Sequence, residues 1–194
     1  MEAPEIAETQ AWVRRAVVGL NLCPFAKAPF AKAQIRYVLS AAIDTDALLA
    51  QFVAELHALA AADPQRVETT LLIHPKVLTD FLDFNDFLDR ADRALDDTGL
   101  AGTLQLASFH PRYQFAGTRS DDLSNATNRS PHPTLHLLRE ASIDSAVAAF
   151  PEAEAIFEAN IRTLEALGAQ GWADLQAQCR AEALAMPAAS RPLP

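Results

Sequence analysis

Three features are missing from the sequence, and each absence argues against a class of protein. No apolar run is long enough to span a bilayer, and the acidic N-terminus "MEAPEIAETQ" lacks the positive charge of a secretory signal. Only two cysteines occur, Cys23 and Cys179, which are too few for a disulfide framework. No glycine-rich phosphate-binding motif occurs either. We therefore expect a soluble, cytoplasmic protein with no membrane partner.

Basic residues are scarce and unevenly distributed. The net charge of −9 argues against general nucleic-acid binding. The segment Thr9–Ile43 nevertheless carries basic residues and no acid, whereas Asp44–Phe109 is strongly acidic. His110–Glu140 again contains more arginines than acids. This distribution would suit a pocket for a small anionic molecule, although the same bases could simply complement acidic helices nearby.

The order of predicted elements indicates an α/β fold. The chain length of 194 residues and the hydrophobic content of 50% suffice for one domain. Helical periodicity and short β-branched or apolar runs alternate, with helices expected at 5–20, 44–64 and 79–99 and strands at 35–40, 68–75 and 103–109. This β-α-β-α-β order predicts a small parallel sheet of about three strands with an N-terminal helix and several C-terminal helices. We expect a single domain over residues 1–184 and a flexible tail over 185–194.

Two histidines are expected at the same edge of this sheet. His74 and His110 each follow a predicted strand and each precede a proline. Open α/β sheets bind ligands at the carboxyl ends of their parallel strands, so both imidazoles are candidate catalytic groups. The alternative is that each His-Pro step only ends a strand and its ring bonds a nearby backbone carbonyl.

A long polar segment separates the third predicted strand from the next apolar run. A loop of this length in a compact domain is usually functional. Guanidinium groups can bind a phosphate or carboxylate with two hydrogen bonds, and asparagine amides can orient it. The candidate ligand-binding residues are Arg112, Arg119, Asn125, Asn128 and Arg129. The alternative is a loop in which Asp121 and Asp122 pair with these arginines and the amides cap turns.

The stretch "SPHPTLHLLRE" predicts a helix that starts at Pro133. His136 and Glu140 would then share a helical face, with Arg139 beside them as a further ligand-binding candidate. We interpret His136 as a group that orients a charged ligand or acts on it as an acid or base. His132 has the i, i+4 spacing of zinc-protease ligands, but no acid lies between it and His136, so no metal site is predicted.

Cys23 has two possible interpretations. Nearby cations, including Lys27 and Lys32, would lower the pKa of its thiol and favour a nucleophilic thiolate. A position after a helix, among residues that look suited to packing, instead favours a buried and inert thiol. Cys23 therefore stays a candidate for covalent catalysis, while Cys179 is expected to be structural.

Several motifs together resemble a bacterial family known as domain of unknown function 1415. They are "GLNLCPFAKAPF", "ETTLLIHP", "DFNDFLDRAD", "LASFHPRYQFAGTRSDDLSNATNRSPHPTLHLLREASI" and "EANIRTLEALG". The resemblance covers residues 6–170. It implies no activity, substrate or cofactor.

Two functions follow from these candidates. In the first, the protein is an enzyme in which Arg119, Arg129 and Asn125 hold a small anionic metabolite while His110, with His74 or His136, moves a proton. Hydrolases and transferases of phosphorylated or carboxylated compounds would be the first classes to assay. In the second, the same pocket binds a metabolite or a partner without catalysis. The sequence specifies neither a cofactor nor an oligomeric state.

Overall fold

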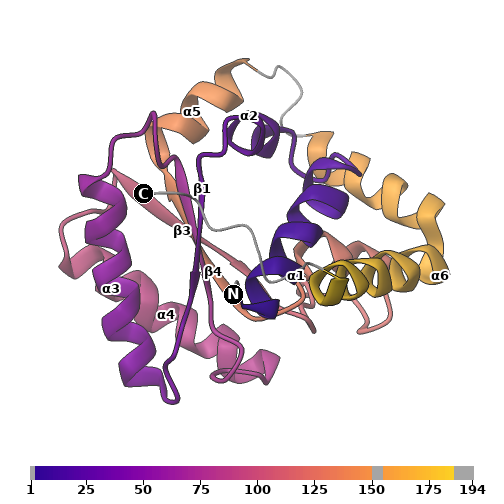
Figure 1. Ribbon diagram of the computed structural model, residues 1–194, viewed down its shortest axis with the longest axis horizontal. Helices are drawn as coiled ribbons and strands as arrows, with labels where there is room; N and C mark the ends of the chain where they lie inside the picture. The colour runs from indigo at the N-terminus through magenta and orange to yellow at the C-terminus, as the bar shows by residue number, and fades with distance from the viewer. Residues whose placement is uncertain (1–2, 150–154, 186–194) are drawn as a thin grey trace.

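The computed structural model describes residues 3–149 and 155–185 (Figure 1). These residues form an α/β fold around one mixed sheet of four strands in the order β1-β2-β4-β3. The strands are β1 (Ile35–Leu39), β2 (Thr69–Ile73), β3 (Leu104–Phe109) and β4 (Thr134–Arg139). The predicted α/β class and the three predicted strands are confirmed. The expected all-parallel sheet of three strands is not, because a fourth strand is inserted.

Strand β4 explains the mixed topology. It runs antiparallel to both β2 and β3, while β1 and β2 are parallel. Strands β1, β2 and β3 therefore point the same way, but β2 and β3 are not neighbours. The apolar side chains of β4 alternate, so that Leu135 and Leu137 are fully buried in the main core.

The predicted helix at Pro133 is therefore wrong. Buried and less buried side chains alternate with a period of two residues, as expected for a central strand. Pairing with β2 and β3 makes these residues a strand, although the spacing of the histidines also fits a helix. His136 lies on the strand, and Glu140 starts the helix that follows it. The two residues consequently share no helical face, and neither do His132 and His136.

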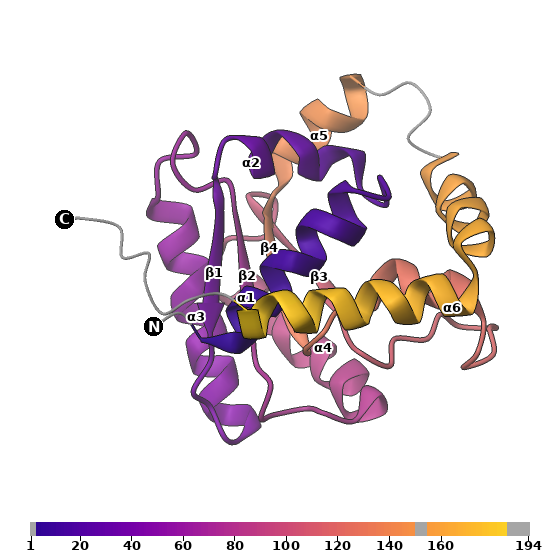
Figure 2. The same cartoon turned by 45° about the vertical axis from the view of Figure 1, so that its right-hand side comes forward.

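Helices cover both faces of the sheet (Figures 1 and 2). Side-chain carboxylates of Asp44 and Asp80 cap the two long helices that pack on one face. Gly168, with φ of 72°, interrupts the last helix. The helical segments are α1 (Pro4–Trp12), η1 (Val13–Val18), η2 (Pro24–Ala26), α2 (Lys27–Ala31), α3 (Thr45–Ala61), α4 (Phe81–Asp97), η3 (Leu123–Asn128), α5 (Glu140–Ala149) and α6 (Ile156–Ala185).

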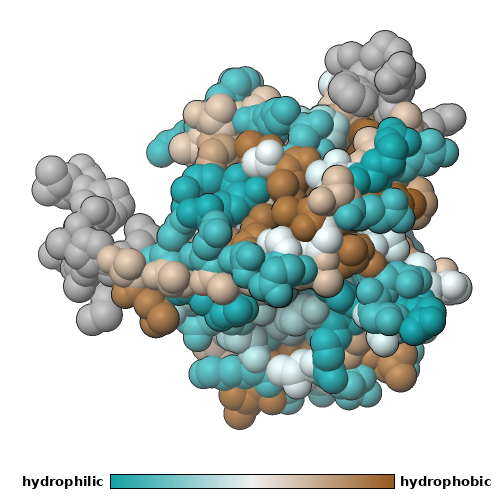
Figure 3. All heavy atoms as spheres, turned by 90° about the vertical axis from the view of Figure 1, so that its right-hand side faces the viewer, coloured by the Kyte–Doolittle hydropathy of each residue, from teal (hydrophilic) through white to brown (hydrophobic). Residues whose placement is uncertain are grey.

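Two apolar clusters lie on opposite faces of the sheet. Helices α3 and α4 enclose the first, whereas α1, η1 and α6 contribute to the second. Most residues of the first cluster are completely buried, but several in the second retain some exposure. Figure 3, which views the side crossed by α6, shows hydrophobic residues gathered in the middle of this face with hydrophilic residues around them. The α1 and α6 layer thus covers the sheet less completely.

The remaining segments lie near the ends of the sheet. Helices α2 and α5 lie at the end where β1 starts and β4 stops (Figure 2). Within the described residues, no helix is long and apolar enough to cross a membrane. Apart from Ala185, which ends α6, the predicted tail lies outside the described residues.

Candidate functional site

The structure brings His74 and His110 together at the predicted edge of the sheet. The residues before them, Ile73 and Phe109, both pair with Thr134 at the start of β4. Both imidazoles also contact Phe84 of α4, with ring centroids 5.7 Å and 5.2 Å away. The side chains lie beneath α4 and are almost fully buried, with exposed fractions of 1% and 0%.

The hydrogen bonds of this pair are local. Nδ1 of His74 donates to the carbonyl of Val77 at 2.9 Å. Nδ1 of His110 accepts from the backbone N–H of Arg112 at 3.0 Å, and its Nε2 faces the carbonyl of Leu78 at 3.2 Å. Burial lowers the pKa of His74 to about 4 and lowers that of His110. Both rings are therefore neutral at pH 7.

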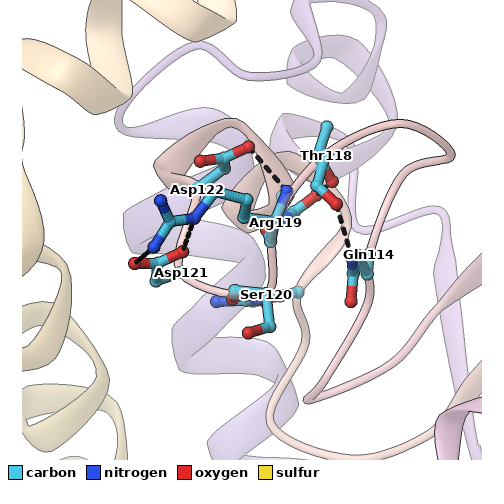
Figure 4. A network of polar contacts seen from close by, with 8 residues as sticks. Gln114, Thr118, Arg119, Ser120, Asp121 and Asp122 are labelled. Atoms are coloured by element: carbon cyan, nitrogen blue, oxygen red, sulfur yellow. Dashed lines mark hydrogen bonds and ion pairs between the residues drawn. The ribbon is translucent and has the colours of Figure 1, made fainter.

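Residues 110–133, here called the carboxyl-end loop, use most of their polar groups on one another (Figure 4). Nε of Arg119 donates to the Asp121 carboxylate at 3.0 Å, and the Asp122 carboxylate accepts from the Arg119 backbone. The amide of Gln114 donates to the carbonyl of Thr118 at 2.6 Å. This part of the loop follows the alternative in which its own aspartates pair with an arginine.

Asn125 is the buried centre of the carboxyl-end loop. Its Oδ1 accepts from the Phe115 N–H at 2.9 Å and from the Thr118 hydroxyl at 2.8 Å. Its Nδ2 donates to the Arg119 carbonyl at 2.7 Å. With no exposed surface, this side chain holds the loop together rather than facing solvent.

Two further arginines are also engaged within the protein. Arg129 donates to the carbonyls of Tyr113 and Ser120. Arg112 donates to the Thr79 carbonyl at 2.7 Å and lies 3.2 Å from the Asp80 carboxylate at the start of α4. These contacts attach the loop to itself and to α4.

The last two candidate ligand-binding residues lie in different elements, because Asn128 ends η3 and Arg139 ends β4. The amide of Asn128 makes a long contact of 3.4 Å to the carbonyl of Ser108. Arg139 instead donates to the carbonyls of Leu59 and Ala62, at the C-terminal end of α3. This position suits a cation, because free carbonyls at a helix C-terminus carry partial negative charge.

A cavity of about 840 Å³ lies on the sheet face opposite α3 and α4. We call it the sheet-face cavity. Strands β2, β3 and β4 form its floor, and the N-terminal segment and α5 form its walls. Its polar lining residues are Cys23, Lys32, Gln34, Gln65, Glu68, Thr69, Thr103, His136, Arg139, Ser142 and Ser145. Its largest apolar side chains are those of Trp12, Phe25 and Phe109.

His136 presents a free nitrogen to the sheet-face cavity. The Thr69 hydroxyl donates its proton to the Leu137 carbonyl at 2.6 Å, so it must accept from Nε2–H of His136 at 2.7 Å. Nδ1 is then unprotonated, and it makes no hydrogen bond within the described part of the chain. Burial lowers the pKa of His136 to about 4, so the ring is a neutral acceptor at pH 7.

Aromatic rings continue the wall beside His136. Phe109 lies with its ring centroid 5.8 Å from that of His136, and Trp12 meets Phe109 edge to face at 5.2 Å. Such contacts fix ring orientations in an apolar wall. The imidazole is therefore held between a hydrogen-bonded hydroxyl and a row of aromatic side chains.

Cys23 lines the same cavity as His136, on a different wall. It immediately precedes the short helix η2, and backbone N–H groups of Phe25 and Ala26 favour its thiolate. Burial has the larger effect and raises the pKa of the thiol. Cys23 is therefore a protonated thiol at neutral pH.

Charge in the sheet-face cavity is positive overall. Lys32 and Arg139 line it, and neither forms an ion pair with a carboxylate among the described residues. Glu68 is the single acid in the lining. The lining thus carries one net positive charge in a protein of net charge −9.

Sequence reasoning missed Thr69, the hydroxyl that sets the tautomer of His136. The sequence does place a threonine at the start of a β-branched strand. A helix over residues 134–139, however, gives no reason to pair this threonine with His136. For metal binding, the described residues contain no group of three or more histidines, cysteines and acids placed to hold an ion.

Comparison with protein families identifies a family to which the chain is similar. The model of the family described as "Protein of unknown function (DUF1415)" matches residues 5–174. The chain belongs to this family. A search of curated proteins and a search of solved structures each gave no match. For this DUF1415 member, the function must therefore be argued from the site itself.

Proposed function

We propose that this protein is an enzyme that acts on a small anionic molecule bound in the sheet-face cavity, with His136 as its acid/base group. The observation that supports this most is the open Nδ1 of a tautomer-fixed imidazole inside a large, mainly apolar cavity. Ligand sites typically combine apolar walls with a few convergent polar groups. The cavity also brings together His136 and Cys23, two of the candidate catalytic residues.

The chemistry available to His136 starts from its neutral form. Nδ1 can accept a hydrogen bond from a hydroxyl or amine of the substrate and take up its proton as charge develops there. The Thr69 hydroxyl keeps Nε2–H in place during this transfer. Because burial holds the pKa of His136 near 4, an anionic group on the substrate would favour the protonated ring and bring its pKa closer to neutrality.

Anion recognition in this proposal differs from the expectation based on sequence. The arginines and Asn125 in the carboxyl-end loop already have internal partners, so that loop supports the fold. Arg139 likewise donates to backbone carbonyls, whereas Lys32 lines the sheet-face cavity and has no carboxylate partner among the described residues. We assign the anion to Lys32.

A second candidate function is binding without catalysis in the same cavity. Burial raises the pKa of Cys23 and lowers that of His136, so neither group is in its charged form at pH 7. Two unactivated groups in an apolar cavity are what a carrier or sensor of a small molecule would need.

The experiment that separates these functions compares two histidine variants. The protein is incubated with a metabolite extract, and mass spectrometry follows both retained and converted compounds. His136→Gln keeps a donor near the Thr69 hydroxyl but lacks the Nδ1 acceptor. His57→Gln is the matched control, because His57 is exposed on α3.

An enzyme should convert at least one compound, and His136→Gln should abolish conversion while His57→Gln does not. Retention without conversion would favour the binding protein. If neither retention nor conversion depends on His136, the proposal that the cavity is the functional site is wrong.

A further inference from the structure

One wall of the sheet-face cavity is a short segment, residues 23–33, here called the strap. It contains η2 and α2, and Figure 2 shows α2 beside α5 at one end of the sheet. A ligand that enters or leaves the cavity on this side must pass the strap. The strap residues that line the cavity are Cys23, Phe25, Ala26, Ala28, Pro29 and Lys32.

The strap is anchored at both ends and packs little in between. Leu22 and Gln34, which flank it, are buried, with exposed fractions of 5% and 8%. Nδ2 of Asn160 donates to the Leu22 carbonyl at 2.8 Å, and the Gln34 amide donates to the Gln65 carbonyl at 2.7 Å. The structure describes every strap residue, and none of them is buried.

A second cavity accounts for this sparse packing. Its volume is about 650 Å³, and its lining includes Phe30 and Ala33 of the strap together with residues of α1 and α6. Ile35 lines both cavities. Of the strap residues, Phe30 packs partly buried against the second apolar cluster. Cavities therefore flank the strap, and a segment with few packing contacts opens at low free energy.

The junction of the strap with Gln34 is strained. Ala33 has φ of 54°, in the left-handed region. This conformation is unfavourable for alanine, because its Cβ comes too close to the following carbonyl oxygen. Such strain is often found at segments that switch between two conformations. Opening would let Ala33 leave this conformation, which offsets part of the contacts that opening breaks.

We propose that the strap opens about its junctions with Leu22 and Gln34 and so controls access to the sheet-face cavity. The sheet and both anchors stay in place during this motion. Opening exposes the Cys23 thiol, which faces the cavity when the strap is closed. The inference concerns how a ligand enters and does not depend on the chemistry of that ligand.

The test measures how fast the Cys23 thiol is labelled in the full chain. The reagents are methyl methanethiosulfonate, which is small, and fluorescein maleimide, which is much larger. Peptide mass spectrometry follows Cys23 and Cys179 separately. Each rate is compared with that of the same thiol in the urea-unfolded chain, which gives a protection factor. Cys179, only 1% exposed in the second apolar cluster, reports global unfolding.

Local opening predicts a distinct pattern for Cys23. Its protection factor should be at least about 100-fold smaller than that of Cys179, because local opening costs less free energy than global unfolding. The two reagents should give the same protection factor, since an open strap admits both. Low urea concentrations should leave the value for Cys23 unchanged and lower that of Cys179, because little surface is exposed by opening.

Three variants locate the motion. Phe30→Ala removes a partly buried ring that holds the strap down, and should lower the protection factor of Cys23 about tenfold for both reagents. Lys27→Ala is the matched control within the strap, because Lys27 is exposed and lines neither cavity. It should change neither cysteine. Asn125→Ala destabilises the carboxyl-end loop, so it should lower the protection factor of Cys179 and leave that of Cys23 unchanged.

Four results would overturn the inference. They are an unprotected Cys23, a protection factor that is larger for the larger reagent, the same protection and urea dependence at both cysteines, and no effect of Phe30→Ala. Each would leave the proposed function standing, because conversion that depends on His136 is measured separately. Loss of that conversion with the labelling pattern intact would remove the proposed function and keep the strap.

Discussion

The carboxyl-end loop and the sheet-face cavity both contain many polar groups, but they differ in whether those groups are paired. In the loop, Arg119, Arg129 and the buried Asn125 all bond other loop residues. In the cavity, Nδ1 of His136 and the Lys32 ammonium have no partner among the described residues. A functional group must keep bonding capacity for its ligand, so the cavity is the better candidate although the loop is richer in polar residues.

The histidines show the same difference. His74 and His110 are enclosed beneath α4 and bond backbone groups. His136 shares their neutral state but lies in a cavity. Similar pKa shifts thus accompany different surroundings, because His74 and His110 are enclosed whereas His136 lines a cavity.

The largest expected effect tests the structural role of the loop. Asn125→Ala would remove three hydrogen bonds and leave the half-buried Phe115 N–H without a partner. We expect the free energy of unfolding, measured by urea denaturation, to fall by about 3 kcal/mol.

Asn128→Ala is the matched control, because its amide makes only one long contact. It should lower the same quantity by less than about 1 kcal/mol. If Asn125→Ala kept full stability and lost ligand binding instead, the loop rather than the cavity would be the ligand site.

The second prediction concerns acid. The pKa of His74 is about 4 in the folded protein against an ordinary value of 6.5, so the unfolded chain binds more protons between these pH values. The contribution of His74 to the free energy of unfolding should therefore be constant above the ordinary pKa and fall by about 3 kcal/mol as the pH drops towards 4. His136, whose pKa is also about 4, should add a similar fall over the same range. Urea denaturation across this range measures the change.

His74→Asn tests the assignment of this loss. The asparagine amide can still donate to the Val77 carbonyl but cannot titrate. The variant should be less stable at pH 7, since it packs less well against Phe84, and should have a shallower pH dependence. An unchanged pH dependence would show that His74 is not neutral in the folded protein.

The third prediction concerns Thr69. Thr69→Val leaves Nε2–H of His136 without an acceptor in the core, and should lower the free energy of unfolding by about 1–2 kcal/mol. It should also weaken conversion of the ligand, because the tautomer of His136 is no longer fixed. Thr69→Ser keeps the hydroxyl and should restore conversion. If Thr69→Val converted the ligand as well as the original chain does, the hydroxyl would play no positioning role.

The smallest effect is expected at Arg119. Its ion pair with Asp121 is exposed, so Arg119→Ala should change the free energy of unfolding by less than about 0.5 kcal/mol. Binding of a ligand in the cavity should not change. A loss of binding measured by calorimetry would restore the loop as the anion site.

The elements with a clear period were predictable. Helices α3 and α4 have apolar spacing and aspartate caps, and the expected strand ends fall within two residues of those observed. Strand β4 was missed because His132, His136 and Glu140 share a spacing of four residues, which also fits a helix. Pairing with β2 and β3 decided the outcome, and such pairing connects residues far apart in the sequence.

The candidate site was harder to predict for the same reason. Strand direction alone predicts that His74 and His110 lie at the same edge of the sheet, and the structure places them there. Their burial does not follow, because it depends on how α4 packs over them. The pairing of Thr69 with His136 joins two strands, so no local pattern contains it.

The most direct test of the central claim is ligand conversion by His136→Gln and Arg119→Ala, measured beside the unfolding free energy of each at pH 7. We predict that both variants fold with stabilities within about 1 kcal/mol of the original chain. We also predict that only His136→Gln loses conversion. Conversion that survives in His136→Gln but is lost in Arg119→Ala would contradict the assignment of function to the sheet-face cavity.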